Sequence, residues 1–175
     1  MKKKEKIDLI QSAIDNTLIC RCYFCYDENY FYYYPNAVND KFILGQEEDD
    51  FQLDGYNIRK ISHLEKAQVR DDKCNEINRL NGLTEKINMP DVDITSWQTV
   101  FTSLKAMDTF VIVEDALAGN FAIGTIEKVL KNKIRFLRFD ADGIWDSEPI
   151  EIIYSSITNV AWNTRYTKNW EKYLR

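Results

Sequence analysis

The sequence is poor in the residues that most enzyme and membrane motifs need. It has one histidine, three prolines and six glycines among 175 residues. A catalytic triad or a two-histidine metal site would therefore depend on His63 alone. No run approaches the roughly 18 to 20 apolar residues of a membrane-spanning helix, and no continuous apolar segment follows the basic start MKKKEKIDLIQ, as it would in a signal peptide. We therefore expect a cytoplasmic, non-enzymatic protein with no membrane association, no cofactor and no bound metal.

Positive charge is also in short supply. The formal net charge is −5, and residues 97–175 carry ten basic and ten acidic side chains. A protein that binds nucleic acid through phosphates commonly presents an excess of lysine and arginine. The composition therefore makes nucleic acid a less favoured partner than protein.

Aromatic residues, by contrast, are plentiful, at 13% of the chain, which favours β-strands and a compact core. An internal repeat organises them. When residues 61–69 are placed on residues 154–162 without a gap, Ser62 falls on Ser155 and Leu64 falls on Ile157. Self-similarity of this kind indicates a duplicated structural unit.

The segments that precede the two copies of this repeat show the same order of predicted elements. Each half begins with apolar residues at spacings of three and four, which is the pattern of one buried helical stripe. Strand-like runs follow, separated by turn signals such as DG at 54–55 and DADG at 140–143. The strands open alike, with Asn16-Thr-Leu-Ile and Asp108-Thr-Phe-Val. We predict a first unit over residues 1–80, a linker over 81–96 and a second unit over 97–175, each with a helix, about five strands and a closing helix. The stripe residues are Ile7, Ile10 and Ile14 in the first unit, and Trp97, Val100, Phe101 and Leu104 in the second.

One helix followed by about five strongly bent strands resembles the Sm-like and SH3-like small barrels, as found in small bacterial proteins. The resemblance rests on element order and on the repeated nine-residue segment. It implies an α+β, mainly β fold of two tandem five-stranded small barrels with flanking helices. The Asp-x-Asn loop and Ile-Arg-Gly signature of the Sm family proper are absent at matching positions. The resemblance therefore implies a scaffold for binding and gives no support to the RNA activity of that family.

The stretch ICRCYFCYDENYFYYYP contains three of the four cysteines. Cys22 and Cys25 have the Cys-x-x-Cys spacing of zinc and redox motifs. The run between them is β-prone and lacks a knuckle glycine, and no second pair completes a four-ligand site. A metal or redox protein that uses these cysteines, His63 or nearby carboxylates is therefore the least favoured alternative. We expect the cysteines to be small packing residues.

Two features are candidates for partner binding. Strand alternation places three tyrosines on one side of the strand, while Phe31 and Tyr33 lie on the other. A run of four carboxylates follows and would suit a basic partner. We predict docking of a protein or peptide, or self-association, through Tyr30, Tyr32, Tyr34, Glu47, Glu48, Asp49 and Asp50.

A locally basic hairpin in the second unit gives the alternative, which is RNA or DNA binding. Alternation distributes its cations over both sides of the strands, so they form no single stripe. The residues are Lys128, Lys131, Lys133, Arg135 and Arg138.

Overall fold

The computed structural model describes all 175 residues. The chain forms two compact units, Met1–Pro90 and Asp91–Arg175. The boundary falls inside the segment 81–96. The units together contain four α-helices and eleven strands. No helix is both long enough and apolar enough to cross a membrane.

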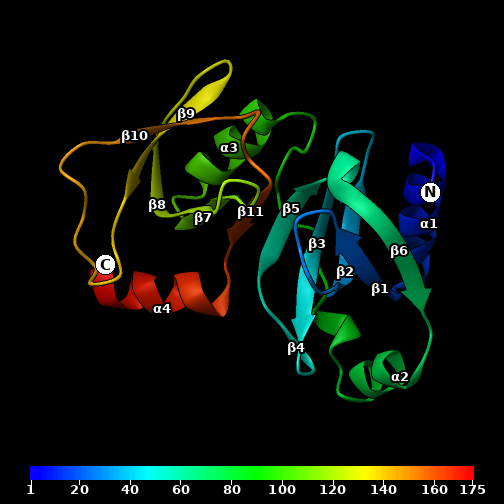
Figure 1. Ribbon diagram of the computed structural model, residues 1–175. Helices are drawn as coiled ribbons and strands as arrows, with labels where there is room; N and C mark the ends of the chain where they lie inside the picture. Colours follow the sequence, from blue (N-terminus) through cyan, green and yellow to red (C-terminus); the bar gives the residue numbers. More distant parts are fainter. The chain divides into compact units, whose positions relative to one another are not determined.

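The first unit begins with helix α1 and continues with an antiparallel sheet in the strand order β5-β3-β2-β1-β6, with β4 beside β3 (Figure 1). A 3-10 turn, η1, joins β5 to β6, and helix α2 follows the last strand. The elements are α1 (Lys3–Asn16), β1 (Ile19–Phe24), β2 (Phe31–Val38), β3 (Phe42–Asp49), β4 (Gln52–Leu53), β5 (Tyr56–Lys60), η1 (Ile61–His63), β6 (Leu64–Arg70), α2 (Lys73–Leu80) and η2 (Thr84–Lys86).

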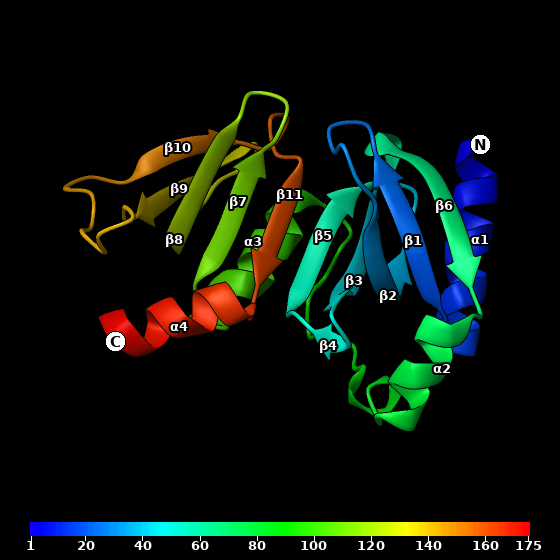
Figure 2. The same ribbon diagram turned by 60° about the horizontal axis from the view of Figure 1, so that its bottom comes forward.

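The second unit repeats this plan. Helix α3 precedes an antiparallel sheet in the order β10-β9-β8-β7-β11, and helix α4 closes the chain (Figure 2). If the five main strands of each unit are numbered in chain order, both sheets have the order 4-3-2-1-5. The elements are α3 (Trp97–Ala106), β7 (Val111–Asp115), β8 (Asn120–Val129), β9 (Lys133–Arg138), β10 (Ile150–Ile153), β11 (Asn159–Trp162) and α4 (Arg165–Leu174).

The two units share strand register as well as strand order. Cys20 pairs with Tyr33 in the first sheet, and Val111 pairs with Gly124 in the second. Both residues of the second pair lie 91 positions after the corresponding residues of the first pair. The ladder between the second and third strands breaks at matching points, between Pro35 and Ala37 and between Ile126 and Lys128. A shared β-bulge position is a strong mark of common architecture, because bulges fix how a strand bends.

Strand pairing at the end of each unit also follows the sequence repeat. Val69 pairs with Cys20 and Trp162 pairs with Val111, which are the residues that the nine-residue repeat places together. The first helices end alike, because Thr17 and Asp108 both adopt the left-handed conformation, at φ 51° and φ 50°. Non-glycine residues rarely adopt this conformation.

The strand openings are aligned one residue differently from the pattern that the sequence suggests. The ladders place Thr17, rather than Asn16, on Asp108, and therefore Ile19 on Phe110. Both apolar side chains are buried. In both units the left-handed residue between the helix and the strand stands at the same place relative to the ladder.

The sheets are antiparallel, as expected for an α+β fold, and helices pack on both faces of them. They are not closed into barrels, however, because the two outer strands of each unit do not pair with one another. In the first unit the 3-10 turn directs the chain from the end of β5 to the far side of β1, where β6 adds to the sheet. The curved sheets therefore remain open at one side.

Each unit has core clusters on both faces of its sheet, one on the side of its first helix and one on the side of its closing helix. In the first unit Ile10 and Ala13 are the buried residues of α1 and pack against the sheet. The second unit buries four side chains of its first helix: Trp97, Val100, Phe101 and Leu104. The predicted stripe is fully buried in α3, whereas in α1 only Ile10 of the stripe is buried and Ile7 and Ile14 are half-buried.

Candidate functional site

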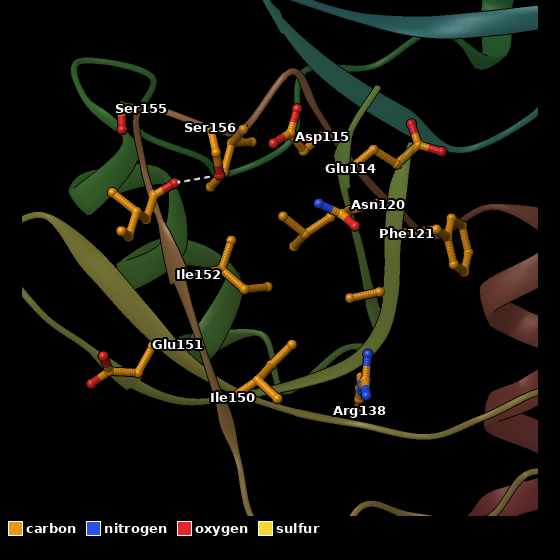
Figure 3. Close-up of a pocket in the computed structure, with 14 residues that line it drawn as sticks. Glu114, Asp115, Asn120, Phe121, Arg138, Ile150, Glu151, Ile152, Ser155 and Ser156 are labelled. Atoms are coloured by element: carbon orange, nitrogen blue, oxygen red, sulfur yellow. Dashed lines mark hydrogen bonds between the residues drawn. The ribbon is translucent and has the colours of Figure 1, made fainter. Parts of the chain in front are cut away.

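The second unit contains an open cavity of about 420 Å³ on the concave face of its sheet (Figure 3). This volume lies within the range of about 300–1,000 Å³ that is typical of ligand pockets. The residues that line it come from β7, β8, β9, β10 and the turns beside them. They are Val113, Glu114, Asp115, Asn120, Phe121, Ala122, Arg138, Ile150, Glu151, Ile152, Ile153, Ser155, Ser156 and Ile157.

Strand alternation explains the apolar floor and wall of the pocket. Val113 and Ala122 are ladder partners and therefore share one face of β7 and β8. Ile150 and Ile152 share one face of β10. Strands β7 and β10 are separated by two others in the sheet, so the sheet must curve to bring β10 over Val113 and Ala122. That curvature forms the pocket.

Polar groups lie at both ends of this apolar centre (Figure 3). Asp115 and Ser156 lie at one end, Asn120 lies between the walls, and Arg138 lies at the other end. The Arg138 Nε donates to Asp146 at 2.5 Å, so its charge is already compensated.

The carboxylates around the pocket differ in their partners. Glu151 forms an ion pair with Lys133 at 2.7 Å and its side chain points away from the pocket in Figure 3. Glu114 accepts a hydrogen bond from the side-chain amide of Asn159. Asp115 accepts only the backbone N–H of Ala118, at 3.2 Å, and forms no ion pair. Asp115 is therefore a half-buried carboxylate at the rim that has no cationic partner.

In the first unit larger side chains occupy the positions equivalent to those that line this pocket. Phe31, the partner of Cys22, corresponds to Ala122, the partner of Val113. Phe24 is the last residue of β1, and the same shift of 91 positions places it on Asp115, the last residue of β7.

Strands β5 and β10, and the turns that follow them, also carry larger side chains in the first unit than in the second. Arg59, the partner of Ile43, corresponds to Ile152, the partner of Ile134. His63 corresponds to Ser156 in the turn that follows. Three rings and a guanidinium in the first unit are thus replaced in the second by an aspartate, an alanine, a serine and an isoleucine.

Arg59 forms the centre of the filled site in the first unit. Its side chain is only 5% exposed and pairs with Asp27 at 2.6 Å. The guanidinium carbon lies 4.4 Å from the Phe31 ring centre and 4.8 Å from that of Phe24, within the range of a cation–π contact. Burial alone would lower the pKa of Arg59, but the nearby tyrosines and carboxylates outweigh burial and raise it, so the group stays charged.

Two carboxylates near this arginine respond to burial. Burial raises the pKa of Asp27, although the attraction of Arg59 partly opposes the rise. Burial also raises the pKa of Glu47 to about 7, again opposed by Arg59. Glu47 is therefore a half-buried carboxyl that is partly protonated near neutral pH.

The predicted tyrosine surface divides into a buried part and an open part. Tyr34 is fully buried, and its hydroxyl donates to Asn75 of α2 at 3.1 Å. Tyr30 is 40% exposed and lies 5.3 Å from Tyr32, ring centre to ring centre. Arg21 lies over both rings, at 4.2 Å and 5.3 Å. Tyr30 is exposed and Tyr32 is half-buried, whereas Tyr34 fixes α2 to the sheet.

The predicted acidic run divides in the same way. Glu47 and Glu48 belong to strand β3 and point to opposite faces of the sheet. Glu48 is buried, and its carboxylate accepts the N–H of Phe51 at 2.7 Å. Only Asp49 and Asp50 are exposed, so the run does not form a continuous four-carboxylate surface.

The cysteines are separated by the fold. Cys20 and Cys22 are buried on one face of β1, Cys25 is exposed after the strand ends, and all four cysteines are free. Burial raises the pKa of Cys20 to about 12, which disfavours the reactive thiolate. No group of three or more histidine, cysteine or acidic side chains is arranged to hold a metal ion. His63 lies beside Tyr26, with ring centres 5.5 Å apart.

Most cations of the basic hairpin in the second unit are already paired. Lys133 pairs with Glu151 at 2.7 Å, Arg135 with Glu127 at 2.9 Å and Arg138 with Asp146 at 2.5 Å. Lys128 and Lys131 are exposed. Such pairing leaves little positive charge for phosphate contacts.

Sequence reasoning missed the pocket residues Asp115, Ala122 and Ile152. The sequence signal for these residues was the repeat itself. Extending the repeat through every strand would have aligned Asp115 with Phe24 and Ala122 with Phe31. The repeat was detectable only near the closing strand, where the replacement of His63 by Ser156 is visible. Comparison with protein-family models, curated proteins and solved structures finds no match to this chain.

Proposed function

We propose that this protein is a non-enzymatic binding module whose second unit docks a segment of a protein or peptide partner. Each unit would be a small-barrel variant with its sheet left open. The observation that supports the proposal is the pocket of about 420 Å³ on the concave face of the second unit. At equivalent positions the first unit carries Phe24, Phe31 and Arg59, and this filled copy would serve as a structural partner.

The strand beside the pocket offers a way to hold an extended chain. Strand β10 is the outer strand of its sheet and pairs within the unit only with β9. The Tyr154 N–H donates to Asn132 on the β9 side, at 3.0 Å, so by alternation Glu151 and Ile153 direct their backbone groups away from β9. The Ile153 carbonyl is taken by Ser156. Glu151 can therefore pair with an added strand, which is a known mode of peptide recognition.

Filling the pocket tests the proposal. Ala122→Phe would place in the second unit the side chain that the first unit carries, and Ala106→Phe would place the same ring on an exposed position of α3 as a matched control. Displayed libraries of random twelve-residue peptides would be selected against the full chain and both variants. We expect sequences enriched on the unmodified chain and on Ala106→Phe to be lost on Ala122→Phe. Equal enrichment on Ala122→Phe would show that the pocket is not the docking site.

A further inference from the structure

We infer that the pocket of the second unit recognises an aromatic ring joined to a cationic group, as in a peptide segment with an aromatic residue next to arginine or lysine. This inference rests on the proposed function and specifies its ligand. Its basis is the correspondence between the two units, since the first unit shows which groups fit this space in this fold.

The aromatic part follows from the replaced rings. Phe24, Phe31 and His63 occupy the first unit where the second has Asp115, Ala122 and Ser156. In the first unit Phe24 lies 6.3 Å from the Tyr33 ring and 5.9 Å from the Tyr26 ring, in the usual range for aromatic pairs. The second unit has the apolar walls for a ring, but no ring of its own at these positions.

The cationic part follows from the charges. In the first unit the Arg59 guanidinium lies against two phenylalanine rings and pairs with Asp27. In the second unit Ile152 replaces the guanidinium, while Asp115 supplies a carboxylate at the pocket rim without a cation. The only cation of the lining, Arg138, is paired with Asp146. A ligand that brings both a ring and a positive charge would therefore restore the combination found in the first unit.

Benzamidine, a phenyl ring bearing an amidinium, is a direct probe of this chemistry. Benzoate has the same ring with a negative charge, and acetamidine has the same cation without the ring. Binding to the full chain would be followed by the NMR shifts of the Ala122, Ile150 and Ile152 methyl groups. We expect benzamidine to shift these methyl groups saturably, benzoate to bind at least about tenfold more weakly, and acetamidine to produce no saturable shift.

Two variants separate the contributions. Asp115→Asn should weaken benzamidine binding up to about fivefold, which is the range for a solvent-accessible ion pair, and leave the binding of toluene unchanged. Ala122→Phe should abolish the binding of both compounds. Both variants would first be checked for unchanged backbone amide spectra away from the pocket.

The outcomes distinguish this inference from the proposed function. Equal binding of benzamidine and benzoate, or an Asp115→Asn variant with unchanged affinity for benzamidine, would overturn the charge requirement while the docking proposal stood. If no ring compound binds but the selected peptides still depend on Ala122, the ring requirement fails. If the peptide selection also shows no dependence on Ala122, the proposed function itself fails.

Discussion

Phe31 and Ala122 occupy the same place in the two sheets: Phe31 pairs with Cys22 as Ala122 pairs with Val113. The two units therefore share a strand order but differ in their interiors. The first is filled by rings around a buried arginine, and the second is open and accessible. Two units of the same strand order therefore differ at the positions that fill the space in one and line a cavity in the other.

Exchanging these two side chains should affect stability unequally. Phe31→Ala would remove a ring that contacts Arg59, and we expect the free energy of unfolding to fall by about 2–4 kcal/mol. Ala122→Phe enters an existing cavity and should change it by less than about 1 kcal/mol. Urea unfolding of both variants measures this, with the exposed Phe121→Ala as a control expected within about 1 kcal/mol of the unmodified chain. A large loss for Ala122→Phe would mean that the pocket cannot accept a ring.

Replacing the buried Arg59 by isoleucine, the residue at the equivalent position of the second unit, should destabilise the chain. Arg59→Ile would leave Asp27 without its ion-pair partner, and we expect a loss of about 2–4 kcal/mol. Adding Asp27→Asn should recover part of that loss, because the unpaired charge is removed. Chemical denaturation would be compared with Arg79→Ala, which breaks an exposed pair with Asp71 and should cost less than about 1 kcal/mol. Equal losses for Arg59→Ile and Arg79→Ala would contradict a structural role for the buried pair.

Local sequence patterns predicted the first helix of each unit and most turns, because these depend on short-range spacing. The stripe of Trp97, Val100 and Leu104 indicated the buried face of α3 correctly. The second helix of the first unit was harder to interpret. It buries Asn75 and Asn78, while Leu80 is 81% exposed, so hydrophobicity alone points to the wrong face.

The open sheets and the pocket could not be predicted from the sequence. Both depend on which residues face each other across strands, and that register depends on turn geometry and on β-bulges, which short sequence patterns do not reveal. The acidic run illustrates this: Glu47 and Glu48 read as one surface feature, yet they lie on opposite faces of β3.

The attachment of helix α4 to the start of strand β7 should depend on the Glu171 carboxylate. Glu171 accepts the Phe110 N–H at 2.7 Å and the Thr109 hydroxyl at 3.0 Å. Glu171→Ala leaves the first backbone donor of this strand region without its partner, and we expect a loss of about 1–3 kcal/mol. Hydrogen exchange of the Phe110 amide should accelerate accordingly. Lys172→Ala, on the exposed side of the same helix, is the control and should leave that exchange rate unchanged.

Stability should fall as pH rises from about 4.5 to about 7, in part because of Glu47. Burial raises the pKa of this carboxyl from 4.5 to about 7 in the folded chain, so the folded state binds more protons than the unfolded state within this window. The penalty for ionising Glu47 is absent below the window and complete above it, at about 1–3 kcal/mol. Glu47→Gln should therefore flatten the pH dependence of the free energy of unfolding and stabilise the protein at pH 8, while Asp49→Asn, at an exposed position, should not. Stability measured in urea at pH 5, 6, 7 and 8 decides the matter, and an unchanged slope in Glu47→Gln would show that this carboxyl ionises in the folded chain as it does in water.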